Sequence, residues 1–194
     1  MATEASAMQP TLAAHSRVSR VDINRIGLWL FLLSESFLFA ALLSGRYYLQ
    51  GIYVPHDVDQ FLGLLLTGIL LLSSLSAYRA EVASAHGDLK GCQRNILFTI
   101  ALGLVFIFGV GFEWKLAFEH FPPNTGFGTI FFTTTGIHAF HVITGLIALG
   151  VVYGLGKGGR FSEGSNWGVE GTVKYWHFVD VAWVFIYPTL YLVN

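Results

Sequence analysis

Five ionisable side chains interrupt the long apolar stretches of this sequence. Glu35 lies in FLLSESFLFA, His138 and His141 lie in TTGIHAFHVITG, and His177 and Asp180 lie in KYWHFVDVAWVF. An ionisable group is costly to bury in an apolar membrane segment, so such residues are candidates for function. Residues three apart share one face of a helix, so we expect each of the two histidine-containing segments to present its pair as a unit.

These residues are compatible with three roles. The first is structural, with hydrogen bonds between helices that contribute about 0.6–2 kcal/mol each. The second is ligation of haem b by His141 and His177 from two facing helices. The third is proton handling or transport by Glu35, His141 and Asp180, which the helical rise places within about 10 Å of one another in depth. Glu113 stands apart, at the outer end of another apolar stretch, where headgroups and water can solvate it.

The composition indicates the class of protein in which these groups are positioned. Of 194 residues, 54% are apolar and only 12% are charged, about half of the roughly 25% found in soluble domains. The net charge of −1 gives no basic field for a nucleic acid partner. One cysteine, Cys92, expected on an inner loop, excludes an internal disulfide, a CxxC redox pair and a thiolate-based copper or iron–sulfur centre. The chain is predicted to be an integral membrane protein.

Five apolar segments are long enough to cross the membrane as helices, which takes about 20 residues each. The predicted fold class is therefore all-α, a five-helix transmembrane bundle. We expect the second and third helices to be short and the fourth to be long. A polar segment, 1–25, precedes the membrane domain, 26–194. The predicted spans are 26–47, 61–78, 96–112, 128–154 and 173–192.

The distribution of Lys and Arg predicts the orientation. In or beside the six segments that flank the spans, these residues number three, one, three, one, three and zero. Positive residues concentrate on the cytoplasmic side of a membrane. The N-terminus is therefore predicted to face the cytoplasm or matrix and the C-terminus the outside.

Several residues have packing explanations. Gly150 and Gly154 form a GxxxG pair that permits close helix approach, and serines give the second helix a small-residue face. Trp183 lies deep, one turn beyond Asp180, and Pro188 is expected to bend or end the last helix. An aromatic belt is predicted at the membrane interfaces. Its members are Tyr47, Tyr48, Trp114, Trp167 and Trp176.

Four motifs resemble those of subunit III of the haem-copper respiratory oxidases. The most specific is YWHFVDVAW at 175–183, similar to the family's last-helix signature WHFVDVVW. The segment 136–145 is similar to GxHxxHVxxG, and 34–40 is similar to the SExxxF(F/V)A sequence around the family's mid-membrane glutamate. The pair 113–114 resembles a Glu–aromatic pair at the end of another helix. All four occur in the family's order.

The sequence also departs from the family's pattern. Many members have seven helices, and this chain resembles the five-helix forms that lack the first two. In seven-helix members, a cleft between the first two helices and the remaining ones holds lipids. In this chain, the wall formed by those two helices is absent or comes from a partner subunit. The ending IYPTLYLVN differs from the YWWGS-like ending of many members.

The resemblance implies a non-catalytic subunit of a cytochrome c or quinol oxidase, which reduces O₂ to water and pumps protons. Haem and copper are expected in partner subunits, with no cofactor, metal or catalytic residue in this chain. Expected partners are subunit I, by direct packing, subunit II, small subunits and bound phospholipid, in a prokaryotic plasma (inner) membrane. The alternatives are a subunit-III-like protein of nitric oxide reduction and a free-standing transporter or haem b protein. The resemblance favours buried structural and lipid-adjacent roles for Glu35, His138, His141, His177, Asp180 and Trp183.

Overall fold

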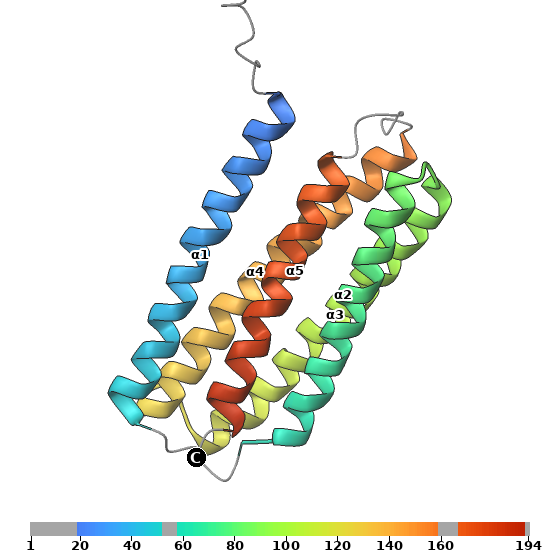
Figure 1. Cartoon of the computed structure of the whole chain (residues 1–194). Helices are drawn as coiled ribbons and strands as arrows, with labels where there is room; N and C mark the ends of the chain where they lie inside the picture. Colours follow the sequence, from blue (N-terminus) through green and yellow to red (C-terminus); the bar gives the residue numbers. More distant parts are fainter. Residues whose placement is uncertain (1–18, 52–57, 159–166, 193–194) are drawn as a thin grey trace, which may run out of the picture.

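The computed structural model describes residues 19–51, 58–158 and 167–192, all of which lie in helices, caps or turns, with no strand among them (Figure 1). The predicted all-α fold with five helices is confirmed. The α-helices are followed by one π-helical turn, η1. The elements are α1 Arg20–Gln50, α2 Gln60–Ala85, α3 Leu89–His120, α4 Gly126–Lys157, α5 Trp167–Tyr187 and η1 Pro188–Leu192.

Four of the helices, α1 to α4, are long and apolar enough to cross a membrane. The third helix, predicted to be short, has 32 residues, as many as the fourth. Hydropathy detects only the apolar middle of a helix, whereas α3 continues through polar residues at both of its ends. The second helix has 26 residues and also extends beyond its predicted span.

Local sequence signals fix the helix ends. Ser19 accepts a hydrogen bond from the backbone N–H of Asp22 while the Asp22 side chain bonds back to the Ser19 N–H, which is a capping box. Asp88 caps α3 directly after Gly87, which adopts a positive φ of 74° and so permits the tight turn from α2. As predicted, α5 ends immediately before Pro188.

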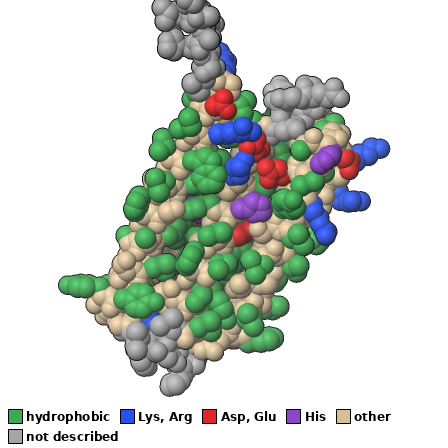
Figure 2. All heavy atoms as spheres, in the orientation of Figure 1, with side chains coloured by type: hydrophobic (Ala, Val, Ile, Leu, Met, Phe, Trp, Pro, Cys, Tyr) green, Lys and Arg blue, Asp and Glu red, His purple; other side chains and the backbone are tan. Residues whose placement is uncertain are grey.

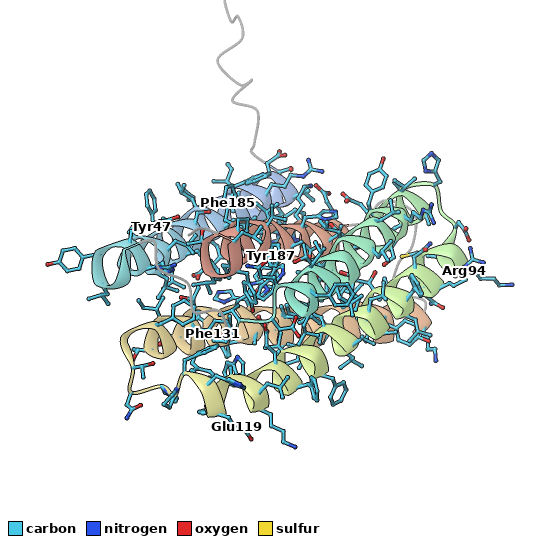
Figure 3. All side chains as sticks on the ribbon, turned by 90° about the horizontal axis from the view of Figure 1, so that it is seen from below. Tyr47, Arg94, Glu119, Phe131, Phe185 and Tyr187 are labelled. Atoms are coloured by element: carbon cyan, nitrogen blue, oxygen red, sulfur yellow. The ribbon has the colours of Figure 1, made fainter. Side chains whose placement is uncertain are left out.

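The helices form a bundle in which α1 is the least embedded. In Figure 1, α2 and α3 lie together on one side, α4 and α5 occupy the middle, and α1 lies at the opposite side. Figure 3 shows Phe131 and Tyr187 within the bundle, whereas Arg94 and Glu119 lie outside it near the two ends of α3. The middle pair, α4 and α5, therefore connects α1 to the α2–α3 hairpin.

Close helix approach occurs at glycines other than the predicted pair. A Cβ atom on Gly103 or Gly145 would lie 2.7 or 2.8 Å from the indole ring of Trp176. A Cβ atom on Gly150 or Gly154 would meet nothing within 4 Å among the described residues, so this pair makes no close helix approach within the described part of the chain. A GxxxG spacing states that two glycines share a face but does not state which helix that face meets.

Two further predictions about single residues are wrong. Trp176, assigned to the interfacial belt, is completely buried because it is turned toward the glycines of α3 and α4. Cys92, assigned to an inner loop, is buried in the first turns of α3, since that helix begins at Leu89. Both errors arise because the sequence does not show how far a helix extends or how it is rotated.

Candidate functional site

The predicted site residues come from three helices. Glu35 is on α1, His138 and His141 are on α4, and α5 carries the rest, namely His177, Asp180 and Trp183. Their neighbours on α2 and α3 complete the surroundings. Figure 2 shows hydrophobic side chains spread along the visible face, whereas charged ones gather toward its upper end. The site therefore belongs to the apolar middle of the molecule.

The closest contact in the site joins α1 to α4. Nε2 of His141 lies 3.1 Å from a carboxylate oxygen of Glu35, and Nδ1 lies 2.8 Å from the backbone carbonyl of Ile137. A carbonyl oxygen only accepts hydrogen bonds, so Nδ1 carries its hydrogen. One proton then lies between Nε2 and Glu35: the pair is either neutral, with the carboxyl donating, or ionic, with the ring donating.

His138 is enclosed by aromatic rings. Its side chain is fully buried, with ring centroids 4.9 Å from Trp183 and 5.7 Å from Phe106. Neither ring nitrogen has a hydrogen-bond partner among the described residues. A charged imidazole without a partner would be very costly in such surroundings, so the ring is neutral and acts as a packing element.

Polar contacts connect α5 with α2. The Ser74 hydroxyl and Nδ1 of His177 are 2.7 Å apart. The indole N–H of Trp183 donates to Thr67 at 2.9 Å, and that of Trp176 donates to Ser73 at 3.0 Å. We call this set of three hydrogen bonds the α2–α5 seam. Because buried polar groups require partners, the seam fixes both the rotation and the register of α5 against α2.

Asp180 lies beside this seam. Its side chain is buried, and its carboxyl faces the Ser74 hydroxyl. Neither carboxyl oxygen has a partner at hydrogen-bond distance in the described part of the chain. Ser74 thus stands between the His177 ring and the Asp180 carboxyl.

The predicted pairing of residues three apart is visible on α4. The rings of His138 and His141 both contact Phe39 of α1, at centroid distances of 6.2 and 5.2 Å. The proposed cluster of Glu35, His141 and Asp180 is not formed as one hydrogen-bonded group, because Asp180 bonds neither of the others within the described residues. Asp180 faces α2 rather than α1.

Sequence reasoning did not anticipate an ion-pair group at one end of the bundle. Arg25 of α1 makes two 3.0 Å hydrogen bonds to the Glu170 carboxylate of α5, and Lys174 contacts the same carboxylate. These hydrogen bonds hold the pKa of Glu170 below its usual range. In the sequence analysis, Arg25 and Lys174 contribute only to the Lys and Arg distribution that predicts the membrane orientation. The i,i+4 spacing of Glu170 and Lys174 was the available indication of a contact.

Glu113 also differs from the prediction. It was expected in contact with headgroups and water, but its side chain is only 5% exposed. The reason is that α3 continues beyond it to His120, while Tyr191 of η1 packs against it from the other side.

The geometry does not suit a metal or a haem. In the described ranges, no group of three or more His, Cys, Asp or Glu side chains could hold a metal ion. Of the histidine pair considered for haem b, His141 has both ring nitrogens engaged, Nδ1 with the Ile137 carbonyl and Nε2 with Glu35. A nitrogen bonded in this way is not available to an iron, so this pair does not supply two ligands. A bis-histidine site needs two rings that face each other across the iron.

The fold and the site define a multi-pass membrane protein whose central ionisable side chains contact one another or neighbouring helices. Comparison with known proteins makes the class specific. The family model described as cytochrome c oxidase subunit III matches residues 5–194. The chain belongs to the cytochrome c oxidase subunit III family.

Individual relatives agree with the family model. A cytochrome c oxidase subunit 3 of Artemia franciscana is 34% identical over 176 residues, covering 86% of this chain and 68% of the relative. That of Thermostichus vulcanus is 32% identical and covers 89% of both chains. That of Corynebacterium diphtheriae is 30% identical, covering 94% of this chain and 96% of the relative.

Proposed function

We propose that this chain is a non-catalytic, cofactor-free subunit of a proton-pumping haem-copper terminal oxidase. In this role it stabilises subunit I and supports proton uptake, while haem and copper reside in partner subunits. The observation that carries the proposal is the contact between Glu35 of α1 and His141 of α4. These two side chains are the groups best suited to redox or proton chemistry, and here they bond each other and hold two helices together, which supports a structural role. Family membership supplies the class of complex.

Subunit I is the proposed direct partner, with subunit II and small subunits elsewhere in the complex. Large apolar side chains cover the outer faces of the helices, including Trp29 and Phe37 on α1 and Phe108 on α3. Such faces require lipid or another transmembrane helix around them. Part of this surface is available for packing against subunit I.

Bound phospholipid is the second proposed partner. A groove of about 630 Å³ lies between α1 and α5. Its walls are mainly apolar, with Trp29, Leu32 and Phe178 among them, whereas Lys174 and His177 supply polar atoms. An acyl chain with a polar head matches such a lining. Glu35 on α1 is then adjacent to lipid, as its 21% side-chain exposure permits.

The proposed location is the plasma membrane of a prokaryote. The polar segment 1–25 lies on the cytoplasmic side, and 26–194 forms the subunit-III-like membrane domain with spans at 26–47, 61–78, 96–112, 128–154 and 173–192. The excess of Lys and Arg in alternate connecting segments supports this orientation. Relatives from bacteria support the prokaryotic assignment.

Affinity purification of this chain from its native membrane in mild detergent tests the proposal. We expect a large haem-containing subunit to be recovered in equal amount, with subunit II beside it. Recovery of the chain alone, in detergent that leaves other respiratory complexes intact, would contradict the proposed role.

A further inference from the structure

A cavity lies at the end of the bundle where α2 begins and α3 ends, opposite the end that holds the Arg25–Glu170 ion pair. The proposed function does not use this cavity. Its volume is about 170 Å³, and it lies between α2, α3 and α4. Most of its wall is apolar, with Leu62 and Phe131 among the lining residues, and Glu113 lies in that wall. We call this space the Glu113 cavity.

Glu113 is a buried carboxyl with no partner at hydrogen-bond distance among the described residues. Its side chain is only 5% exposed, and neither oxygen has such a partner in the described ranges. The hydroxyl of Tyr191, which faces Glu113 from η1, is likewise buried and without a partner there. A buried polar group is stable only when hydrogen-bonded, and two neighbouring groups lack partners here.

Water can satisfy both groups. A single water molecule needs about 10–15 Å³ of a cavity measured by the space open to water centres, together with two to four polar neighbours. The Glu113 cavity is large enough for several molecules, and Glu113 is among its lining residues.

The cavity also has polar residues that reach the surface. Asp59, at the start of α2, and His120, at the end of α3, both line it and are both exposed. Nδ1 of His120 bonds the Leu116 carbonyl, so this nitrogen carries a hydrogen and Nε2 of a neutral ring is an acceptor. Among the described residues, the titratable groups around Glu113 are Asp59, Tyr191 and His120, while α4 contributes the apolar ring of Phe131.

We propose that the Glu113 cavity is a water-filled proton-binding site, in which water connects the Glu113 carboxyl to the aqueous phase past Asp59 and His120. A proton that arrives as hydronium binds one Glu113 oxygen and leaves a water molecule behind, and release reverses this step. The proposal goes beyond the accessory role and does not depend on the identity of the partner subunits.

Infrared spectroscopy of the purified complex tests this proposal. The difference between wild type and Glu113→Gln isolates the carbonyl stretch of the protonated carboxyl. We expect a band that disappears as the pH is raised and that shifts promptly when H₂O is replaced by D₂O. Leu62→Phe, which fills the cavity and keeps Glu113, is expected to slow that shift at least tenfold.

Two results would overturn the proposal. One is the absence of any titrating carboxyl band that Glu113→Gln removes. The other is D₂O exchange that proceeds equally fast in Leu62→Phe. If Glu113→Gln does not assemble, Tyr191→Phe takes its place, because removal of the phenol hydroxyl must shift the frequency of the Glu113 band. An unchanged carboxyl spectrum in that variant would equally refute the site.

Discussion

On the α1 side of the bundle, Glu35 and Arg25 extend to His141 and Glu170 on the neighbouring helices. On the α2 side, short side chains such as Ser73 and Thr67 meet the indole rings of α5 directly. The apolar side chains of α1 are mostly exposed, whereas α2 buries eight residues along its length. A helix with little buried surface depends on a few long polar contacts, whereas a helix packed at close range depends on its small residues.

This contrast has a physical basis. Within a membrane, lipid tails are as apolar as the helix faces, so apolar area alone does not draw helices together. Close packing and hydrogen bonds supply the attraction instead. The α2–α5 seam provides both, while α1 relies mainly on its ionisable contacts and the buried ring of Phe39. Substitutions on the two sides should therefore have different consequences.

The largest expected effect is a clash on the closely packed side. In Gly145→Leu, the new Cβ would lie 2.8 Å from the Trp176 ring, and the rest of the leucine has no space. Overpacking costs about 1–3 kcal/mol and occasionally more. We expect the chain to be lost from the purified complex, as measured by subunit stoichiometry. Gly150→Leu on the same helix is the control, since nothing lies within 4 Å there, and equal losses in both variants would refute this packing account.

The next effect is expected at the contact that holds α1. Glu35→Ala leaves Nε2 of His141 without its partner, which costs about 1–3 kcal/mol for a buried group. We expect a lower midpoint for thermal loss of the chain from the complex. Ser34→Ala is the matched control, because that exposed hydroxyl bonds only the Phe31 carbonyl of its own helix. A midpoint as high as that of the control would mean that the pair does not hold α1.

A smaller effect is expected within the seam. Ser74→Ala removes one hydrogen bond to His177, and such bonds between membrane helices average about 0.6 kcal/mol. The same thermal measurement should show a modest decrease. Ser44→Ala, which alters only a bond within α1, should show none. A decrease larger than that of Glu35→Ala would reverse the proposed ranking of the two sides.

The smallest effect is expected at the exposed end of α1. Glu170→Gln breaks the ion pair with Arg25, and because Arg25 is 47% exposed, solvent screening makes the expected loss of stability small. Because the Arg25 hydrogen bonds hold the pKa of Glu170 low, their stabilisation is complete above the unfolded pKa of about 4.3 and is lost as the pH falls through the folded value. The thermal midpoints of wild type and variant should differ at neutral pH and converge in acid. A difference that persists in acid would contradict this electrostatic origin.

The number and order of the helices could be predicted from the sequence. Apolar stretches predicted five helices, and the helical rise placed Glu35 and His141 within about 10 Å of one another in depth. In the structure the two side chains do meet. The depth of a side chain in the membrane follows from its position along a single helix, so it can be calculated from the sequence.

The choice of partner across helices was not predictable. Asp180 has a similar expected depth to Glu35, but it faces α2. The rotation of α5 is fixed by the hydrogen bonds that Trp176 and Trp183 make in the seam. Likewise, Ser74 is one of the serines on the predicted small-residue face of the second helix, and nothing in the sequence indicates its bond to His177. Rotation and neighbour order arise from the whole bundle and leave no local signal in the sequence.

In the proposed role, the ionisable residues of this chain support an oxidase without taking part in its redox chemistry. The most direct test is the reduced-minus-oxidised haem absorbance per assembled complex in Glu35→Ala and His177→Ala, recorded together with the active lifetime during turnover. We predict unchanged absorbance with weaker assembly or a shorter active lifetime. A loss of haem absorbance per assembled complex in either variant would contradict the account.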